Sequence, residues 1–386
     1  MSAPAAAKAT NKAVSSRDYY RYRRFEGVNL GSWFVNERWI CESVFANAAA
    51  PGQSDLDICK GSNAQKILET HWDNWMTTSD WQFIVNQGMN TVRLPIGYYH
   101  LSQDSIIADT DFAPYGHGAW DRIMMAINTA ASYGLGVLVD LHAAPGGQNT
   151  QPHSGTSSGQ AKLWGNATNQ ACCLSALVFL VQKLSNVDNV IGLELLNEPS
   201  NGNYLAGWYI DTMKELRKYS SDFPIYIHDG FDPAYYAKFV GSHTDLGYVV
   251  QDTHFYRCFS ASDTAKSSDA IIQQVITDTT GFWASMASWS KGRLIVGEWS
   301  AALADSSLKQ STRVFDSSRG YFAYVQLAMF KADVAAGWMF WTVKKESGKD
   351  TAWSLEDARK ANTVPSDFSR FLVLPKGTAP QQPIPA

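Results

Sequence analysis

The sequence predicts an α/β protein built as a single (β/α)8 TIM barrel, with extended loops at the C-terminal face. Eight short apolar runs recur along the 386 residues, separated by longer segments, several of them with helical periodicity. No linker interrupts this alternation. Buried parallel strands have near-continuous Val/Ile/Leu runs because helices cover the sheet. Eight such strands alternating with helices are typical of a barrel.

The predicted strands are short, and most of them end in polar residues. In chain order we expect them at Phe25–Leu30, Asn90–Ile96, Leu135–His142, Val190–Glu198, Pro224–Asp229, Gly247–Tyr256, Arg293–Trp299 and Gly337–Val343.

Apolar residues at helical spacing predict helices between these strands. We expect helices at His71–Gln87, Trp120–Tyr133, Ser175–Leu184 and Tyr321–Val334, the first two stopping at a glycine. Irregular loops are expected at Ala46–Gly61 and Ala143–Asn169, at the functional end of the barrel. Residues 1–20 are predicted to be a flexible segment, residues 21–373 the barrel and residues 374–386 a Pro-rich tail.

Composition excludes several classes of protein. With 45% hydrophobic and 18% charged residues and a net charge of −4, the chain is neither a disordered polyelectrolyte nor a typical nucleic-acid binder. We expect no membrane span, because no run approaches about 18 apolar residues. Met1–Ser16 has no apolar run suited to secretion, which predicts a cytoplasmic protein. The sequon at Asn166 leaves secretion as an alternative, in which case the leader is absent from this sequence.

The cysteines and aromatic residues carry weaker signals. None of the five cysteines has metal-ligand spacing, and we expect neither metal nor cofactor. Cys172 and Cys173 are expected to pack within a helix. Aromatic residues form 13% of the chain, including 14 Trp. Most aromatics belong in a core, but Trp at this density also suits a cleft that stacks on the apolar faces of sugars.

Polar residues end most of the predicted strands, and the C-terminal ends of barrel strands converge on one cleft. Taken singly, an Arg or a His there is more often a buried structural group. Two glutamates are harder to explain, because an unpaired buried carboxylate is costly. These strand-end residues are Arg93, His142, Asn197, Glu198, His254, Tyr256 and Glu298.

Two facing carboxylates are what glycoside hydrolysis requires, one as a proton donor and the other as a nucleophile or base. Phosphoryl transfer lacks support, because no Gly-rich phosphate loop with its Lys is present. Metal-assisted hydrolysis has little support either. His142, His153 and His254 are far apart in sequence, and no H-E-x-x-H motif occurs.

Motifs along the chain resemble glycoside hydrolase family 5, and most closely its fungal exo-β-1,3-glucanases. The similarity extends over about Arg23 to Trp353, with the motifs in the family's order. They are Gly27-Val-Asn-Leu-Gly-Ser-Trp33, Val92-Arg93-Leu-Pro-Ile-Gly97, Asp140-Leu-His142-Ala-Ala-Pro-Gly-Gly-Gln-Asn149, Leu-Leu-Asn197-Glu198-Pro and Val-Gly-Glu298-Trp-Ser.

The resemblance implies a retaining mechanism with Glu198 as acid/base and Glu298 as nucleophile. We expect Arg93 to lower the pKa of Glu298 and a drier site to raise that of Glu198. Retention places the two carboxyl groups about 5–5.5 Å apart.

The resemblance also implies roles for other residues. Asn197 binds the sugar 2-hydroxyl, and Arg93 and Tyr256 orient the nucleophile. His142 and His254 match rim histidines, Glu37 matches the residue that binds the terminal glucose, and Trp341 matches the aromatic floor of the reacting subsite.

The chain departs from the branch near two subsites. Asn36-Glu37-Arg38 replaces the usual Leu-Glu-Pro beside the terminal-sugar pocket. Gln151 stands where a Phe usually clamps the next sugar, although its partner survives as Phe259. Linkage preference at the leaving-group side is therefore open.

We expect a monomeric hydrolase that releases glucose from the non-reducing end of a β-1,3-glucan. Alternatives with the same chemistry are β-1,6-glucan, a glucoside with a large aglycone and a disaccharide glycoside of the rutinosidase type. A non-catalytic glycan-binding barrel is the remaining alternative.

Overall fold

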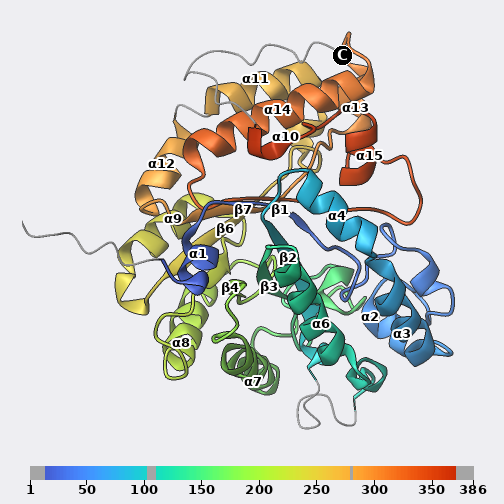
Figure 1. Ribbon diagram of the computed structural model, residues 1–386, viewed down its shortest axis with the longest axis vertical. Coiled ribbons are helices and arrows are strands. Elements are labelled where there is room, and N and C mark those ends of the chain that lie inside the picture. Colours follow the sequence, from blue (N-terminus) through green and yellow to red (C-terminus); the bar gives the residue numbers. More distant parts are fainter. Residues whose placement is uncertain (1–13, 102–109, 279–280, 371–386) are drawn as a thin grey trace, which may run out of the picture.

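The computed structural model describes residues 14–101, 110–278 and 281–370. Eight parallel strands form a closed barrel in which each strand pairs with the next and β8 pairs with β1. Figure 1 shows the helices arranged around these strands. The strands are β1 (Phe25–Asn29), β2 (Thr91–Gly97), β3 (Gly136–Ala143), β4 (Val190–Glu194), β5 (Ile225–His228), β6 (Val249–Phe255), β7 (Leu294–Trp299) and β8 (Gly337–Phe340).

All eight predicted strands are present, which confirms the barrel. Two of them end three or four residues earlier than predicted. β4 stops at Glu194 instead of Glu198, and β8 stops at Phe340 instead of Val343. Residues that follow these strands, including Asn197, Glu198 and Trp341, therefore lie on loops at the rim.

The helices that connect successive strands cover the outside of the barrel. They include α3 (Ala64–Trp75), α4 (Thr78–Asn86), α6 (Ala119–Ser132), α7 (Ala167–Leu184), α8 (Leu205–Leu216), α9 (Pro233–Ser242), α11 (Ser268–Asp278), α12 (Phe282–Trp289) and α14 (Phe315–Asp333). Shorter or peripheral helices are α1 (Ser16–Tyr22), α2 (Asp55–Cys59), α10 (Ala261–Thr264), α13 (Asp305–Lys309) and α15 (Leu355–Lys360).

The single helix predicted at His71–Gln87 is wrong, because α3 ends at Trp75 and α4 begins at Thr78. Thr77 caps α4 by accepting a hydrogen bond from the Asp80 amide, and the Asp80 carboxylate accepts one from the Thr77 amide. This reciprocal capping box starts a new helix.

Two other segments are more ordered than predicted. α7 begins eight residues before the predicted Ser175, with Asn166 as its N-cap. α1 begins at Ser16, inside the segment assigned to the flexible terminus. Arg21 attaches α1 to the barrel by donating to the carbonyls of Ser185 and Val190. The predicted tail at 374–386 lies outside the described residues.

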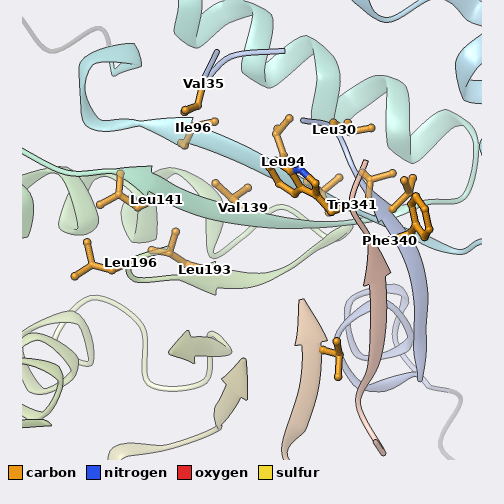
Figure 2. Close-up of a cluster of buried hydrophobic side chains, with 14 of the residues drawn as sticks. Leu30, Val35, Leu94, Ile96, Val139, Leu141, Leu193, Leu196, Phe340 and Trp341 are labelled. Carbon is orange, nitrogen blue, oxygen red and sulfur yellow. The ribbon is translucent and has the colours of Figure 1, made fainter. Parts of the chain in front are cut away.

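Most of the core lies between the strands and the helices. Figure 2 shows part of it, where Leu94 and Ile96 of β2 and Val139 and Leu141 of β3 are buried. In the described ranges no helix combines the length and apolar character that crossing a bilayer requires.

Candidate active site

The inside of the barrel changes from apolar to charged along its axis. Side chains alternate between the two faces of a strand, so residues two apart on β3 share a face, in the order Leu138, Asp140 and His142. An apolar cluster fills the N-terminal end of the barrel, with Phe25, Leu138, Ile191, Tyr226, Val250, Ile295 and Met339. The charged residues of the site therefore lie directly against a buried apolar layer.

Arg93 on β2 lies at the centre of the charged layer and is fully buried. Its five N–H donors face five acceptors on four other strands or their following loops. The acceptors are Glu194 (2.8 Å), Asn29 (3.0 Å), Glu298 (2.9 Å), Asn197 (2.9 Å) and Asp140 (3.1 Å). One guanidinium thus fixes the positions of three carboxylates and two amides.

The imidazole of His254, at the end of β6, lies between the two predicted catalytic glutamates. Its Nδ1 is 2.7 Å from Oε1 of Glu198 and 3.4 Å from Oε2 of Glu298. Those two oxygens are consequently no more than about 6 Å apart, below the ~6.5–9.5 Å of inverting enzymes. The spacing fits direct attack by one carboxylate, with no room kept for an intervening water.

Glu298 has two further donors besides His254. Arg93 donates to Oε1, and the Tyr256 hydroxyl donates to Oε2 at 2.8 Å. Both oxygens are therefore fixed in orientation, as a nucleophile requires. The free oxygen of Glu198, Oε2, faces the Nε2 of His153 at 3.5 Å.

The expected pKa difference between the two glutamates is wrong for the unliganded site. Burial favours neutral Glu198, but the His254 N–H and the surrounding imidazoles outweigh burial and hold the pKa of Glu198 well below its ordinary value. Burial is the largest effect on Glu298 and raises its pKa, although His254 and Arg93 oppose it.

The surroundings of His254 favour its protonated form. Burial lowers the pKa of its imidazole, but the carboxylates of Glu298, Asp252 and Glu198 together hold that pKa well above its ordinary value. Three carboxylates already surround the single cation Arg93, so a second positive charge is favoured here. Nδ1 of His254 lies 2.7 Å from Oε1 of Glu198, within hydrogen-bond distance.

The backbone at Glu198 is in the left-handed region, with φ of 44°. This conformation is uncommon for a non-glycine residue and turns the side chain into the cleft. The loop after β3 supports it, because Gln148 donates to the carbonyl of Asn197 at 2.9 Å and Asn149 donates to that of Glu198 at 2.9 Å.

The residues expected to contact sugar form one side of the site. The Trp341 ring stacks against the His142 ring at 5.7 Å and 11°. Glu37 accepts a hydrogen bond from the Trp39 indole at 2.8 Å. Burial raises the pKa of Glu37 to about 7, and the charges of His142, Glu298 and Glu198 also act on it.

Asn36, the unusual neighbour of Glu37, is held by a buried carboxylate. Its amide nitrogen donates to Asp55 at 2.9 Å, and Asp55 also accepts bonds from the hydroxyls of Tyr99 and Tyr115. Burial raises the pKa of Asp55 to about 6. The loop predicted to be irregular thus contains α2, which fixes the segment that carries Glu37.

Phe259 lies at the outer rim of the site and is 71% exposed. Its ring contacts Tyr256 at 5.7 Å and Trp353 at 5.9 Å. Gln151 is exposed as well. The structure therefore brings the other predicted residues together around the glutamates, while Phe259 stands at the edge.

Sequence reasoning missed four residues of the site: Glu194, His228, Asp252 and His153. Strand alternation was the available signal for Asp252 and His228, which follow the inward residues Val250 and Tyr226 by two positions. Glu194 pairs with Arg93, and His228 packs edge-on against His254 at 4.4 Å.

Two sets of side chains have donor atoms close enough for a metal. They are Glu198, His228 and His254, and Glu194, Asp252 and His254, with donor atoms within 4.8 Å of one another in each set. Both sets need the imidazole of His254, whose Nδ1 lies within hydrogen-bond distance of Oε1 of Glu198, at 2.7 Å.

A separate hollow of about 590 Å³ lies beside α3, lined by residues that include His71, Trp75 and Glu346. It contains none of the predicted site residues.

Known proteins resemble this chain in sequence and in fold. Residues 58–347 match the family Cellulase (glycosyl hydrolase family 5). The chain is 32% identical to glucan 1,3-beta-glucosidase 3 of Schizosaccharomyces pombe, over 88% of this chain and 73% of that protein. It is 29% identical to a probable glucan endo-1,6-beta-glucosidase B of Neosartorya fischeri, over 90% and 88%. The crystal structure of rutinosidase from Aspergillus niger shares the fold, with a TM-score of 0.71 and 18% identity over 89% of this chain and 98% of that one.

Proposed function

Because the chain belongs to glycoside hydrolase family 5, we propose that it hydrolyses a β-1,3-glucan from the non-reducing end and releases glucose with retention of configuration. The observation that carries the chemistry is the single nitrogen of His254 within 3.4 Å of both glutamates. This spacing suits a covalent glycosyl-enzyme intermediate.

In the first step Glu298 attacks the anomeric carbon, and the bond from that carbon to the leaving oxygen breaks. The proton of the His254–Glu198 pair passes through Glu198 to the leaving oxygen. Among the groups that raise the pKa of His254, Glu298 has the largest effect. As Glu298 loses its negative charge on bonding, His254 becomes a stronger acid, which couples attack to proton transfer.

In the second step Glu198 accepts a proton from water, and the water oxygen displaces Glu298 from the anomeric carbon. Arg93 and Tyr256 stabilise the carboxylate that is released. The family resemblance assigns Asn197 to the sugar 2-hydroxyl. Its Oδ1 accepts from Arg93, and its Nδ2 lies 3.3 Å from both His142 and His153, so the hydroxyl would replace one of these two imidazole contacts.

Cleavage from the chain end is supported by Glu37. Its carboxylate lies on a segment braced by Asp55 and can accept hydrogen bonds from the hydroxyls of a terminal glucose. A product time course tests this proposal. Glucose should be the first product. Mixed oligosaccharides that appear before glucose would contradict cleavage from the chain end.

A second candidate is a β-1,6-glucan or a glucoside with a large aglycone. Phe259 is exposed, and the residue expected to face it is the polar Gln151. Hydrolysis of laminarin, pustulan and an aryl β-glucoside in parallel, with Glu298→Ala as the blank, separates the candidates. Preference for laminarin supports the first proposal, and preference for either other substrate supports the second.

A further inference from the structure

His153 approaches the acid/base from the loop between β3 and α7. Its side chain is only 15% exposed, and its Nε2 is 3.5 Å from Oε2 of Glu198. Its Nδ1 is 3.3 Å from the amide nitrogen of Asn197, and its ring lies 5.3 Å from that of His142. The catalytic steps described above give this residue no part.

Hydrogen-bond accounting assigns the tautomer of His153. The Oδ1 of Asn197 accepts from Arg93, so its Nδ2 donates to the two imidazoles beside it. His142 can accept at Nε2, because its Nδ1 donates to Asp140 at 2.6 Å. The Nδ1 of His153 accepts likewise, which leaves its ring proton on Nε2, the atom that faces Glu198.

The two oxygens of Glu198 differ in their surroundings. Oε1 accepts from His254. Oε2 is therefore the oxygen available to the leaving group, and His153 is the side chain beside it. A hydroxyl oxygen can accept one hydrogen bond while donating another, so the His153 N–H and proton donation by Glu198 are compatible.

We propose that His153 is a positioning residue for proton transfer, whose Nε2–H holds Oε2 of Glu198 toward the leaving-group oxygen. The transferred proton leaves Glu198 as the glycosidic bond breaks, and His153 keeps its own. The inference rests on the proposed function only in requiring cleavage of a β-glucoside. The proposed role of His153 differs from that of a loop side chain that only contributes packing.

The charge state of His153 agrees with this role. Burial lowers the pKa of His153 to about 4, so its ring is neutral at neutral pH. Other titratable or charged groups surround this pair on β2, β3, β5, β6 and β7 and on the loops after β1 and β6: Glu37, Arg93, Asp140, His142, His228, Asp252, His254, Tyr256 and Glu298.

Leaving-group dependence tests the proposal. The kcat/KM of His153→Ala and His153→Gln is measured on aryl β-glucosides from phenyl to 2,4-dinitrophenyl. His153→Ala should lower the value for the phenyl glucoside about tenfold or more. The dinitrophenyl glucoside, which needs no acid assistance, should change about twofold or less. His153→Gln keeps a donor and should lie between the wild type and His153→Ala.

The pH profile supplies a second readout. Removing the His153 N–H raises the pKa of Glu198, so the alkaline limb of kcat/KM should move to higher pH. Gln160→Ala, which changes an exposed side chain of the same loop, is the control and should match the wild type. An equal loss on every glucoside with an unmoved pH profile would overturn the proposal.

A carbon-13 NMR titration of the glutamate carboxyls needs no substrate. The pKa of Glu198 should rise in His153→Ala, and an unchanged value would overturn the proposal. If the wild type cleaves aryl β-glucosides but not laminarin, the proposed function fails, while the leaving-group series and this titration still decide the role of His153.

Discussion

The side-chain amide of Asn149 donates a hydrogen bond of 2.9 Å to the backbone carbonyl of Glu198. Glu198 has a left-handed backbone, a conformation that costs about 1–3 kcal/mol for a non-glycine residue and persists only where neighbours impose it. The loop after β3 thus determines the direction of a carboxylate that follows β4.

Asn149→Ala should lower kcat/KM by about tenfold, because losing a partly buried hydrogen bond costs about 1–2 kcal/mol and releases the Glu198 backbone. Asn169→Ala is a matched control. Asn169 donates the same kind of bond, 2.9 Å to the Lys162 carbonyl, but away from the glutamates. Equal activity of the two variants would show that Asn149 does not hold the acid/base.

Azide should distinguish the roles of the two glutamates. In Glu298→Ala, azide occupies the place of the nucleophile and attacks an activated β-glucoside from the opposite face, giving the α-glucosyl azide. In Glu198→Ala, azide replaces water in the second step and gives the β-glucosyl azide. Proton NMR of the anomeric signal distinguishes the two azides. If Glu298→Ala gave the β-azide and Glu198→Ala the α-azide, the two assignments would be reversed.

Arg93→Lys should destabilise the fold and impair catalysis together. Lysine has three donors where Arg93 uses five, so buried carboxylates lose partners at a cost of about 3–5 kcal/mol. Thermal unfolding and kcat measure the two effects. Arg17→Lys changes an exposed ion pair with Asp188 at 3.4 Å and should leave Tm almost unmoved. A similar small shift for both variants would contradict the central role of Arg93.

Product inhibition should report the ionisation of Glu37. Its pKa of about 7 means that the carboxyl is largely neutral at pH 6 and largely ionised at pH 8. Hydrogen bonds to an ionised acceptor are stronger, so glucose should bind about three- to tenfold tighter at the higher pH. This dependence should vanish in Glu37→Gln, and its persistence there would assign it to another group.

Gln151→Phe should restore an aromatic clamp opposite Phe259. Stacking of this kind contributes about 0.5–1.5 kcal/mol, so KM for laminari-oligosaccharides should fall about two- to tenfold. An aryl glucoside without a second sugar should change less. Gln151→Leu separates ring stacking from added apolar surface, and an equal effect of both substitutions would argue against a clamp.

The sequence was sufficient to predict the eight strands, because a buried parallel strand leaves an unmistakable apolar run. It also placed Arg93 and Glu298 correctly on the second and seventh strands, whereas Glu198 lies on the loop after β4. It misplaced the end of β4, since the apolar residues Leu195 and Leu196 continue past the last paired residue, Glu194. Local capping by Thr77 and Asp80 overrode the apolar periodicity of the predicted helix.

The pKa assignments could not be read from the sequence for a different reason. They depend on how many imidazoles surround Glu198, and one of these, His153, arrives on a loop whose path no periodicity specifies. Strand alternation, applied to Val250 and Tyr226, was enough to find Asp252 and His228. The predicted monomeric state and localisation stay predictions.

The arrangement around Arg93 limits how such an enzyme can be redesigned. A single side chain is tied to residues of β1, β3, β4 and β7, so a change in any one of these strands disturbs the others. The segments carrying Glu37 and Phe259 make none of those contacts with Arg93, whereas the segment carrying Gln151 also holds Glu198 through Asn149. New substrates are therefore most accessible by exchanging the first two segments, while the residues around Arg93 change only together.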